Sequence, residues 1–121
     1  MQVQTIELET AIEEINGIPV VRVAGEVDIV TSAELKSAIN KVVNTGAKDL
    51  IIDLSNVSYM DSSGFGVLLS IMKRLRPLGG SITLVGCCEM TERMIRLTRL
   101  DTIFGLFPTL EDAVETMTED G

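Results

Sequence analysis

Residues 53–66 read DLSNVSYMDSSGFG, and this stretch decides the fold because a buried strand gives way there to a helix. The predicted helix begins with two serines, Ser62 and Ser63, beside Asp61. A helix N-terminus leaves backbone N–H groups unpaired and carries partial positive charge, so a hydroxyl placed there can accept a phosphate without unfolding the helix. The stretch therefore predicts a phosphorylation switch whose charge changes while the fold persists.

The segments around this stretch alternate between strands and helices. A polar and apolar alternation over residues 4–15 leads into Asn16-Gly17, which is a strong hairpin signal. Thr31 and Glu34 have the spacing of a capping box at the start of a helix. The helix continues until Gly46 ends it, with apolar residues recurring at helical intervals at Leu35, Ala38, Ile39 and Val42. The other predicted elements are strands at 18–23, 50–54 and 81–85, helices at about 62–76, 91–100 and 110–117, a short apolar segment at 103–106 that could pair at a sheet edge, and a frayed end at 118–121.

This order predicts an α/β fold in which residues 1–121 form a single domain. We expect a mixed, mostly parallel sheet with an antiparallel hairpin at its start, covered by about four helices. A chain of 121 residues with 45% hydrophobic content can bury one core without a disulfide or a metal. No apolar run approaches the roughly 20 residues of a membrane-spanning helix, and residues 1–4 do not begin a secretory signal. We therefore expect a cytoplasmic protein without a membrane partner.

Cysteine and histidine content argues against several kinds of site. Cys87 and Cys88 are adjacent, which is not the spacing of a redox pair, and we expect them to act as small hydrophobic residues at the edge of the core. The sequence has no histidine, which excludes Ser-His-Asp and Cys-His mechanisms and removes the usual nitrogen ligand of zinc. We expect no metal site and no cofactor.

The net charge of −8 is unevenly distributed. Residues 1–61 carry ten acidic and four basic side chains, and residues 101–121 carry six acidic and no basic ones. Between them lies a basic group on two successive predicted helices, namely Lys73, Arg74, Arg76, Arg93, Arg96 and Arg99. The overall charge argues against a nucleic-acid partner. The basic group is either a solvated surface or an electrostatic docking surface for a partner.

Three segments together resemble the anti-sigma factor antagonists of bacteria, which belong to the STAS domain family. They are GEVD at 25–28, DLSNVSYMDSSG at 53–64 and GGSITLV at 79–85. The resemblance covers nearly the whole chain in order, and its most specific part is the sequence MDSSGFG at 60–66. It implies one STAS-like domain.

The resemblance implies a partner-switching protein rather than an enzyme. In its unmodified form such a protein binds an anti-sigma factor that is also a serine kinase, and this frees a sigma factor. The kinase then phosphorylates the antagonist, and a serine phosphatase resets the cycle. The resemblance assigns the phosphate to Ser63 rather than Ser62, and implies a monomer that forms heterocomplexes. The positions that we carry over to the partner-binding surface are Asp28, Asp61, Ser62, Ser63 and Gly64.

The chemistry of the helix start gives Ser63 partial support. If Asp61 or Ser62 caps the helix, that side chain is occupied by a backbone N–H, which leaves Ser63 with a freer hydroxyl. The alternative is that both serines only cap the helix, because Ser and Asp are favoured there in any protein. The residues alone do not separate the two interpretations.

The predicted helix after Ser63 has a wide apolar surface. Helical spacing places Val67, Leu68, Ile71 and Leu75 on one face, which we expect to pack on the sheet. Phe65, Leu69 and Met72 form an adjacent stripe. This stripe either belongs to a well-buried helix or forms a partner-binding patch beside Ser63.

Other functions fit the sequence less well. A serine hydrolase needs a G-x-S-x-G turn and a base, and a P-loop needs G-x-x-x-x-G-K-[ST]; neither motif occurs. A two-component receiver would normally have a late lysine, but no lysine follows Lys73. The main alternative is a non-switching STAS domain that acts as a stress-signalling scaffold or as an accessory subunit of a lipid transporter.

Overall fold

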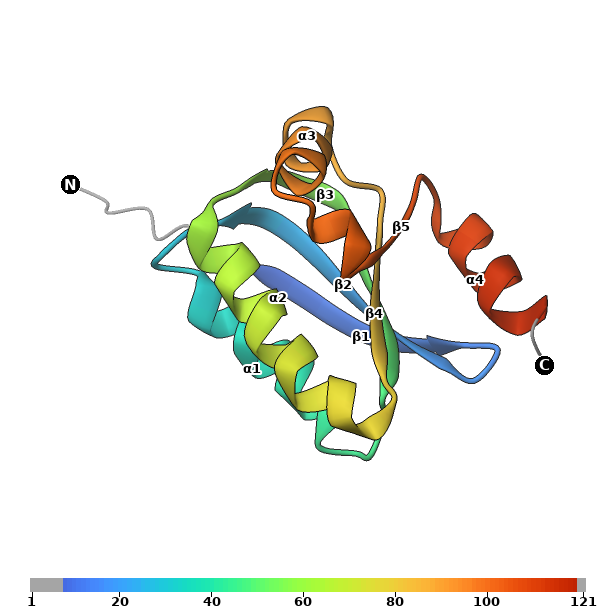
Figure 1. Cartoon of the computed structure of the whole chain (residues 1–121). Helices are drawn as coiled ribbons and strands as arrows, with labels where there is room; N and C mark the ends of the chain where they lie inside the picture. The colour runs from blue at the N-terminus through green and yellow to red at the C-terminus, as the bar shows by residue number, and fades with distance from the viewer. Residues whose placement is uncertain (1–7, 120–121) are drawn as a thin grey trace.

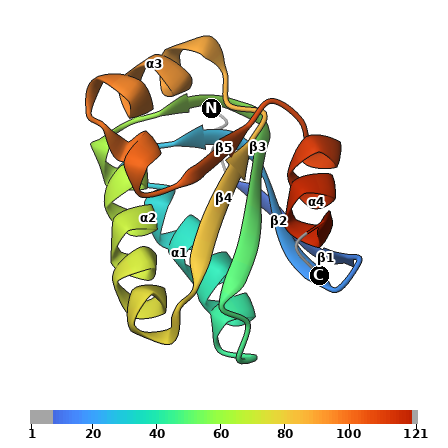
Figure 2. The same cartoon turned by 45° about the vertical axis from the view of Figure 1, so that its right-hand side comes forward.

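The computed structural model describes residues 8–119, which contain one five-stranded sheet. The strands lie in the sheet in chain order; β1 and β2 are antiparallel, and each later neighbour is parallel. Figures 1 and 2 show helices on both sides of the sheet. The elements are β1 (Glu9–Ile15), β2 (Ile18–Val27), α1 (Ser32–Val43), β3 (Asp49–Met60), α2 (Ser62–Leu75), η1 (Arg76–Leu78), β4 (Ser81–Val85), α3 (Glu89–Leu97), η2 (Leu100–Thr102), β5 (Gly105–Phe107) and α4 (Leu110–Glu119). The predicted α/β fold is confirmed.

The hairpin between β1 and β2 forms where Asn16-Gly17 predicted it. Ile15 pairs with Ile18, and the two turn residues have positive φ angles of 52° and 81°. A two-residue hairpin turn with both φ angles positive matches the twist of the strands it joins, and Asn-Gly adopts it readily. The first strand was expected over residues 4–15; it begins at Glu9, and residues 4–7 lie outside the described part of the chain.

β2 and β3 are longer than predicted. We expected them to end near Val23 and Leu54, but they continue to Val27 and Met60. The prediction was wrong because pairing persists through two register shifts, where the apolar alternation that marks a strand is interrupted. As a result Val27 pairs with Met60, and the two strands end side by side.

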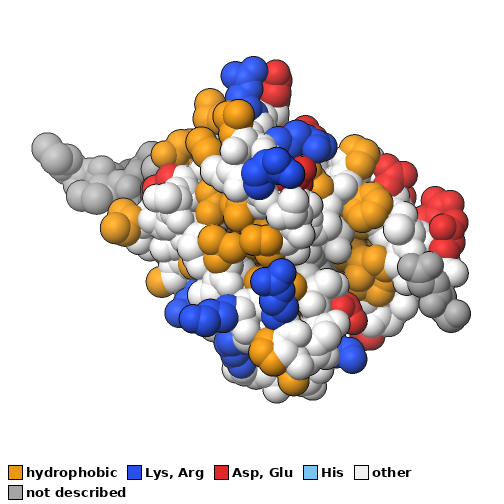
Figure 3. All heavy atoms as spheres, viewed as in Figure 1, with side chains coloured by type: hydrophobic (Ala, Val, Ile, Leu, Met, Phe, Trp, Pro, Cys, Tyr) orange, Lys and Arg blue, Asp and Glu red, His pale blue; other side chains and the backbone are white. Residues whose placement is uncertain are grey.

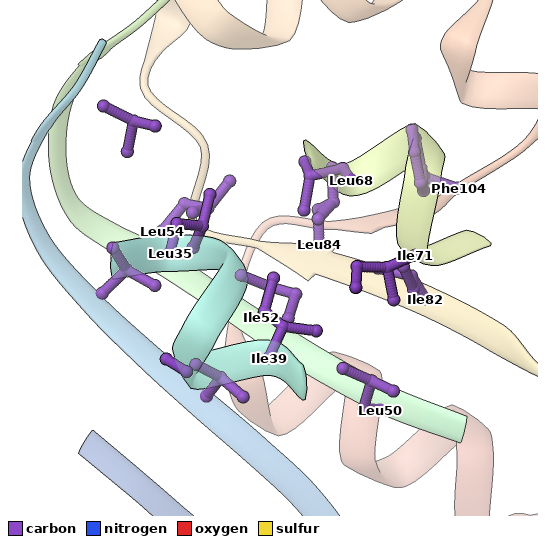
Figure 4. Close-up of a cluster of buried hydrophobic side chains, with 14 of the residues drawn as sticks. Leu35, Ile39, Leu50, Ile52, Leu54, Leu68, Ile71, Ile82, Leu84 and Phe104 are labelled. Atoms are coloured by element: carbon purple, nitrogen blue, oxygen red, sulfur yellow. The ribbon is translucent and has the colours of Figure 1, made fainter. Parts of the chain in front are cut away.

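The larger core lies between the sheet and helices α1 and α2. Leu35 and Ile39 of α1 and Leu68 of α2 are fully buried in this core. Each fully buried side chain of this size stabilises the fold by about 1.5–3 kcal/mol. Figure 4 shows the cluster, in which the labelled residues are Leu35, Ile39, Leu50, Ile52, Leu54, Leu68, Ile71, Ile82, Leu84 and Phe104.

A smaller core lies on the opposite face of the sheet. There Val20, Ile51 and Val85 pack against Ala113 and Val114 of α4. β3 is therefore buried on both faces, as its short apolar run predicted. Figure 2 shows α4 across the sheet from α1 and α2. The fraying expected at 118–121 was wrong for residues 118 and 119, which are helical; residues 120 and 121 lie outside the described part of the chain.

The segment between β4 and α4 differs from the prediction in its boundaries. The helix expected at 91–100 is α3, which begins two residues earlier and ends at Leu97. It ends early because Arg99 adopts a left-handed conformation with φ of 62°. The apolar segment expected at 103–106 forms β5 at the sheet edge, shifted to Gly105–Phe107.

Candidate functional site

The loops after β2 and β3 meet at one end of the sheet. The backbone N–H of Asp61 donates to the carbonyl of Val27 at 3.0 Å, directly beyond the paired residues Val27 and Met60. Asp28 and Asp61 each follow one of these residues. Adjacent strands lie about 4.8 Å apart, so the two acidic loops predicted from the sequence are neighbours in the structure.

Asp61 is the N-cap of α2. Its backbone is extended, with φ of −99° and ψ of −171°, and its Oδ1 accepts the backbone N–H of Ser63 at 2.8 Å. Its carbonyl accepts the amides of Gly64 and Phe65 at 3.1 and 3.3 Å. Ser62 and Ser63 therefore occupy the first two helical positions. The sequence left Asp61 and Ser62 as alternative N-cap residues, and in the structure the N-cap is Asp61.

The hydroxyls of Ser62 and Ser63 are not used for capping. Neither hydroxyl makes a hydrogen bond to another residue within 8–119, whereas the Ser63 amide is held by Asp61. Ser62 is exposed and Ser63 is half-buried. This geometry leaves two hydroxyl groups for modification, with an ordered helix N-terminus beneath them.

Gly64 is required by close packing below the serines. A Cβ atom at Gly64 would lie 2.6 Å from Cγ of Met60 and 2.8 Å from Cγ1 of Val27. These distances are shorter than carbon atoms tolerate, and both neighbours are buried. The glycine lets α2 begin directly over the paired ends of β2 and β3, which fixes the position of Ser63.

Asp28 orders the neighbouring loop. Its Oδ1 accepts the amides of Val30 and Thr31 at 2.9 and 3.0 Å. The hydrogen bond from the Thr31 amide is the main reason that the pKa of Asp28 lies below its ordinary value; partial burial opposes it, and the Val30 amide adds to it. Asp28 therefore carries its negative charge at neutral pH within a fixed turn.

The capping box predicted at Thr31 and Glu34 was wrong. The Thr31 hydroxyl donates to the carbonyl of Glu26 at 2.7 Å and accepts the Asp28 amide at 3.0 Å, so it makes no cap bond to α1. Glu34 instead accepts the amide of Leu8 at 3.1 Å through Oε2. The Thr31 side chain therefore stabilises the β2–α1 loop, and the Glu34 side chain holds the segment before β1.

Sequence reasoning missed three apolar residues beside the site. Ile29 and Val30, between Asp28 and Thr31, are 79% and 76% exposed, and Tyr59 of β3 is 42% exposed. Large apolar side chains at this exposure are a feature of contact surfaces when they gather near a functional group. The available signal was the pair of adjacent β-branched residues in a loop, where polar residues are expected.

The stripe proposed on α2 divides between core and surface. Phe65 and Met72 are 7% and 8% exposed and belong to the larger core, while Leu69 is 38% exposed. Val67, expected in the core, is half-buried at its edge. Of the three stripe residues, only Leu69 presents substantial side-chain surface to a partner.

The two cysteines lie in different environments. Burial raises the pKa of Cys87 to about 12, with a further contribution from Glu92. Cys88 is the N-cap residue of α3, and its Sγ lies 3.2 Å from Oγ1 of Thr91. That contact, followed by the Thr91 amide, lowers the pKa of Cys88 below the ordinary thiol value. Cys87 packs against the core edge as predicted, but the same expectation was wrong for Cys88, which is not part of the core cluster.

Metal-binding clusters and membrane spans are both absent from the described part of the chain. Between residues 8 and 119, no three His, Cys, Asp or Glu side chains are grouped so as to hold a metal ion. None of the helices over the same range is long and apolar enough to cross a membrane.

Most of the chain matches one protein family and its known members. The model of the STAS domain family matches residues 9–113. The anti-sigma-F factor antagonist RsfB of Mycobacterium tuberculosis is 38% identical over 101 residues, which cover 82% of this chain and 80% of that protein. The anti-sigma-B factor antagonist of Staphylococcus aureus is 32% identical over 80 residues, covering 66% of this chain and 74% of that protein. A crystal structure of an anti-sigma factor antagonist from Mycobacterium paratuberculosis matches with a TM-score of 0.82 and 38% identity, covering 90% and 92% of the two chains.

Proposed function

The chain belongs to the STAS domain family, and from this premise we propose that it is an anti-sigma factor antagonist. In its unmodified form it binds an anti-sigma factor and thereby releases a sigma factor. It acts by binding rather than by catalysis. The similarity to antagonists from two bacteria, each over about two thirds of the chain or more, supports this function.

Phosphorylation of Ser63 switches the antagonist off. The anti-sigma factor acts as a serine kinase and transfers the terminal phosphoryl group of ATP to Oγ of Ser63, which loses its proton while ADP leaves. A serine phosphatase later hydrolyses the new ester and restores the hydroxyl. One observation carries this proposal: at the helix start the Asp61 carboxylate accepts the Ser63 amide, which leaves the Ser63 hydroxyl free.

The added charge acts on binding rather than on folding. A phosphoserine adds about −1.5 to −2 charges at neutral pH, close to Asp61 and Asp28. The start of α2 offsets this by about 0.3–1 kcal/mol per charge while the site faces water. A partner that covers the site removes the water, and an unmatched dianion is then costly. The antagonist therefore releases its partner while its own fold remains intact.

The partner contacts a surface around Ser63. The polar part consists of Asp28, Asp61, Ser62, Ser63 and Gly64. Ile29 and Val30 supply exposed apolar area next to Asp28, and Leu69 supplies it further along α2. Phe65 and Met72 support this surface from the core and do not provide its main contact area.

Mass spectrometry of the protein after incubation with ATP and an extract of its source cell tests the proposal. The matched variants are Ser63→Ala and Ser62→Ala, which each remove one of two adjacent hydroxyls at the same helix start. We expect one phosphate on the parent and on Ser62→Ala, and none on Ser63→Ala. If neither serine is modified while an established antagonist is modified in its own extract, the protein is a non-switching STAS domain.

A further inference from the structure

A groove lies on the face of the protein beyond Ser63, between the second half of α2 and the segment that follows α3. It has a volume of about 420 Å³, and its lining residues are Leu69, Met72, Lys73, Arg76, Pro77 and Ile103. Arg76 is 13 residues beyond Ser63, which places it about 20 Å further along the helix axis at 1.5 Å per residue. The groove is therefore distinct from the phosphorylation site, although Leu69 belongs both to the groove and to the proposed partner surface around Ser63.

The groove combines an apolar floor with basic edges. Leu69, Met72 and Ile103 form the floor, and Pro77 continues it beyond the end of α2. Lys73 and Arg76 are exposed, and neither makes an ion pair with another residue in 8–119. Figure 3 shows hydrophobic side chains gathered in the middle of this face, with Lys and Arg side chains above and below them.

The groove is locally basic on a molecule whose net charge is −8. Arg22 pairs with Glu13 and Asp53 and Arg96 pairs with Glu92, whereas Lys73 and Arg76 are among the cations that form no ion pair within residues 8–119. Unpaired cations beside an exposed apolar surface match a partner that presents apolar side chains flanked by carboxylates. A nucleic acid would not use the apolar floor, and the overall negative charge would repel it.

We propose that this groove docks a short, acidic, amphipathic helix of a partner protein. The groove from Leu69 to Arg76 spans two helical turns, about 10 Å, which suits leucine-like side chains at i, i+3 and i+4. A second copy of this chain is a poor occupant, because its acidic helix α4 already packs Ala113 and Val114 against its own sheet. The contact does not depend on Ser63 and goes beyond the proposed switch: it persists when Ser63 is phosphorylated.

A designed peptide tests the groove without knowledge of the natural partner. The probe has about 14 residues, with leucines at i, i+3, i+4 and i+7 and glutamates elsewhere. One control peptide has lysines in place of the glutamates, and another has serines in place of the leucines. Binding is followed by amide chemical shifts of the full chain in solution.

We expect the acidic peptide to shift the amides of Leu69, Lys73, Arg76 and Ile103, with binding that weakens as salt is added. The double variant Lys73→Glu/Arg76→Glu should weaken binding about tenfold or more, whereas Lys36→Glu/Lys48→Glu, with the same net charge change, should have little effect. Both control peptides should bind more weakly. Phosphorylation of Ser63 should leave the affinity within about twofold, since Lys73 and Arg76 lie about 15 and 20 Å beyond Ser63 along the helix axis, which is more than a Debye length.

Four outcomes of the experiments in solution would overturn the inference, and a fifth can come from vesicles. The first four are the absence of shifts at the groove, shifts centred on residues 61–64, equal binding of the lysine peptide, and a concentration-dependent dimer whose interface includes the groove. Vesicles of anionic phospholipid provide a final comparison. If the vesicles bind the parent protein more tightly than the peptide does, and the double variant Lys73→Glu/Arg76→Glu no longer binds them, the face is a membrane-binding surface instead.

Discussion

Oδ1 of Asp61 accepts the backbone N–H of Ser63 at 2.8 Å, and this contact separates two functions at one helix start. The aspartate stabilises α2, so Ser63 is not needed for capping. The serine hydroxyl can then change its charge without loss of the cap. A serine that capped the helix itself would lose that role on modification.

Removal of the Asp61 carboxylate should therefore destabilise the fold. We expect Asp61→Ala to lower the free energy of unfolding by about 0.5–2 kcal/mol, because the Ser63 amide loses its acceptor. Asp61→Asn keeps an oxygen in the same place and should cost much less. Urea denaturation followed by circular dichroism measures both. Equal stability of Asp61→Ala and the parent protein would contradict the capping role.

Gly64 and Gly66 should respond in opposite directions to the same substitution. Gly64→Ala should destabilise the protein by about 1–3 kcal/mol, because its methyl group collides with Met60 and Val27. Gly66 lies on the same helix and is exposed, and a methyl group added there would meet no atom within 4 Å. Gly66→Ala should stabilise the protein by about 0.5–1 kcal/mol through helix propensity. Thermal unfolding of the two variants checks the packing; destabilisation by Gly66→Ala alone would refute it.

Leu69 and Phe65 lie one turn apart on α2 but should act on different properties. Phe65→Ala should lower the free energy of unfolding by about 3–5 kcal/mol, because the side chain is in the core. Leu69→Ala should cost less than about 1 kcal/mol, since the side chain is 38% exposed, and should weaken partner binding. Denaturation and binding of the same samples separate the effects. A loss of several kcal/mol in Leu69→Ala would place Leu69 in the core.

The adjacent cysteines should differ in reactivity toward iodoacetamide. The thiolate is the reactive form, so the lowered pKa of Cys88 raises its reactivity at about pH 8, and the pKa of about 12 for Cys87 suppresses it. Peptide mass spectrometry should find Cys88 labelled first in the folded protein and both cysteines labelled in denaturant. Thr91→Val should slow labelling of Cys88, because the hydrogen bond that lowers its pKa is lost. Faster labelling of Cys87 would contradict the assignment.

The sequence predicted the parts of the fold that depend on local pattern. Asn16-Gly17 defines the hairpin, and the apolar spacing of Leu35, Ala38, Ile39 and Val42 defines the buried face of α1, because these signals involve neighbouring residues. It did not predict the ends of β2 and β3. Val27 and Met60 extend the strands by pairing with each other, and a contact between residues so far apart in the chain has no local signature.

The candidate site shows the same division. The MDSSGFG sequence located the helix start and its serines, but the capping box at Thr31 failed because Asp28 and Glu26 compete for the same polar groups. The stripe on α2 was ambiguous, since helical spacing gives the direction of a side chain but not what covers it. Packing of Met72 in the larger core, which depends on residues distant in the chain, distinguishes it from exposed Leu69. The groove at Ile103 could not be predicted either, because it forms between segments that are far apart in the chain.

We expect a phosphate on Ser63 to release the partner without unfolding the antagonist. The most direct test measures the affinity of the anti-sigma factor for the unmodified protein and for protein phosphorylated at Ser63, together with the melting temperature of each form. We predict a loss of affinity of about tenfold or more, with little change in melting temperature. Equal affinity of the two forms, or unfolding of the phosphorylated form, would contradict the switch.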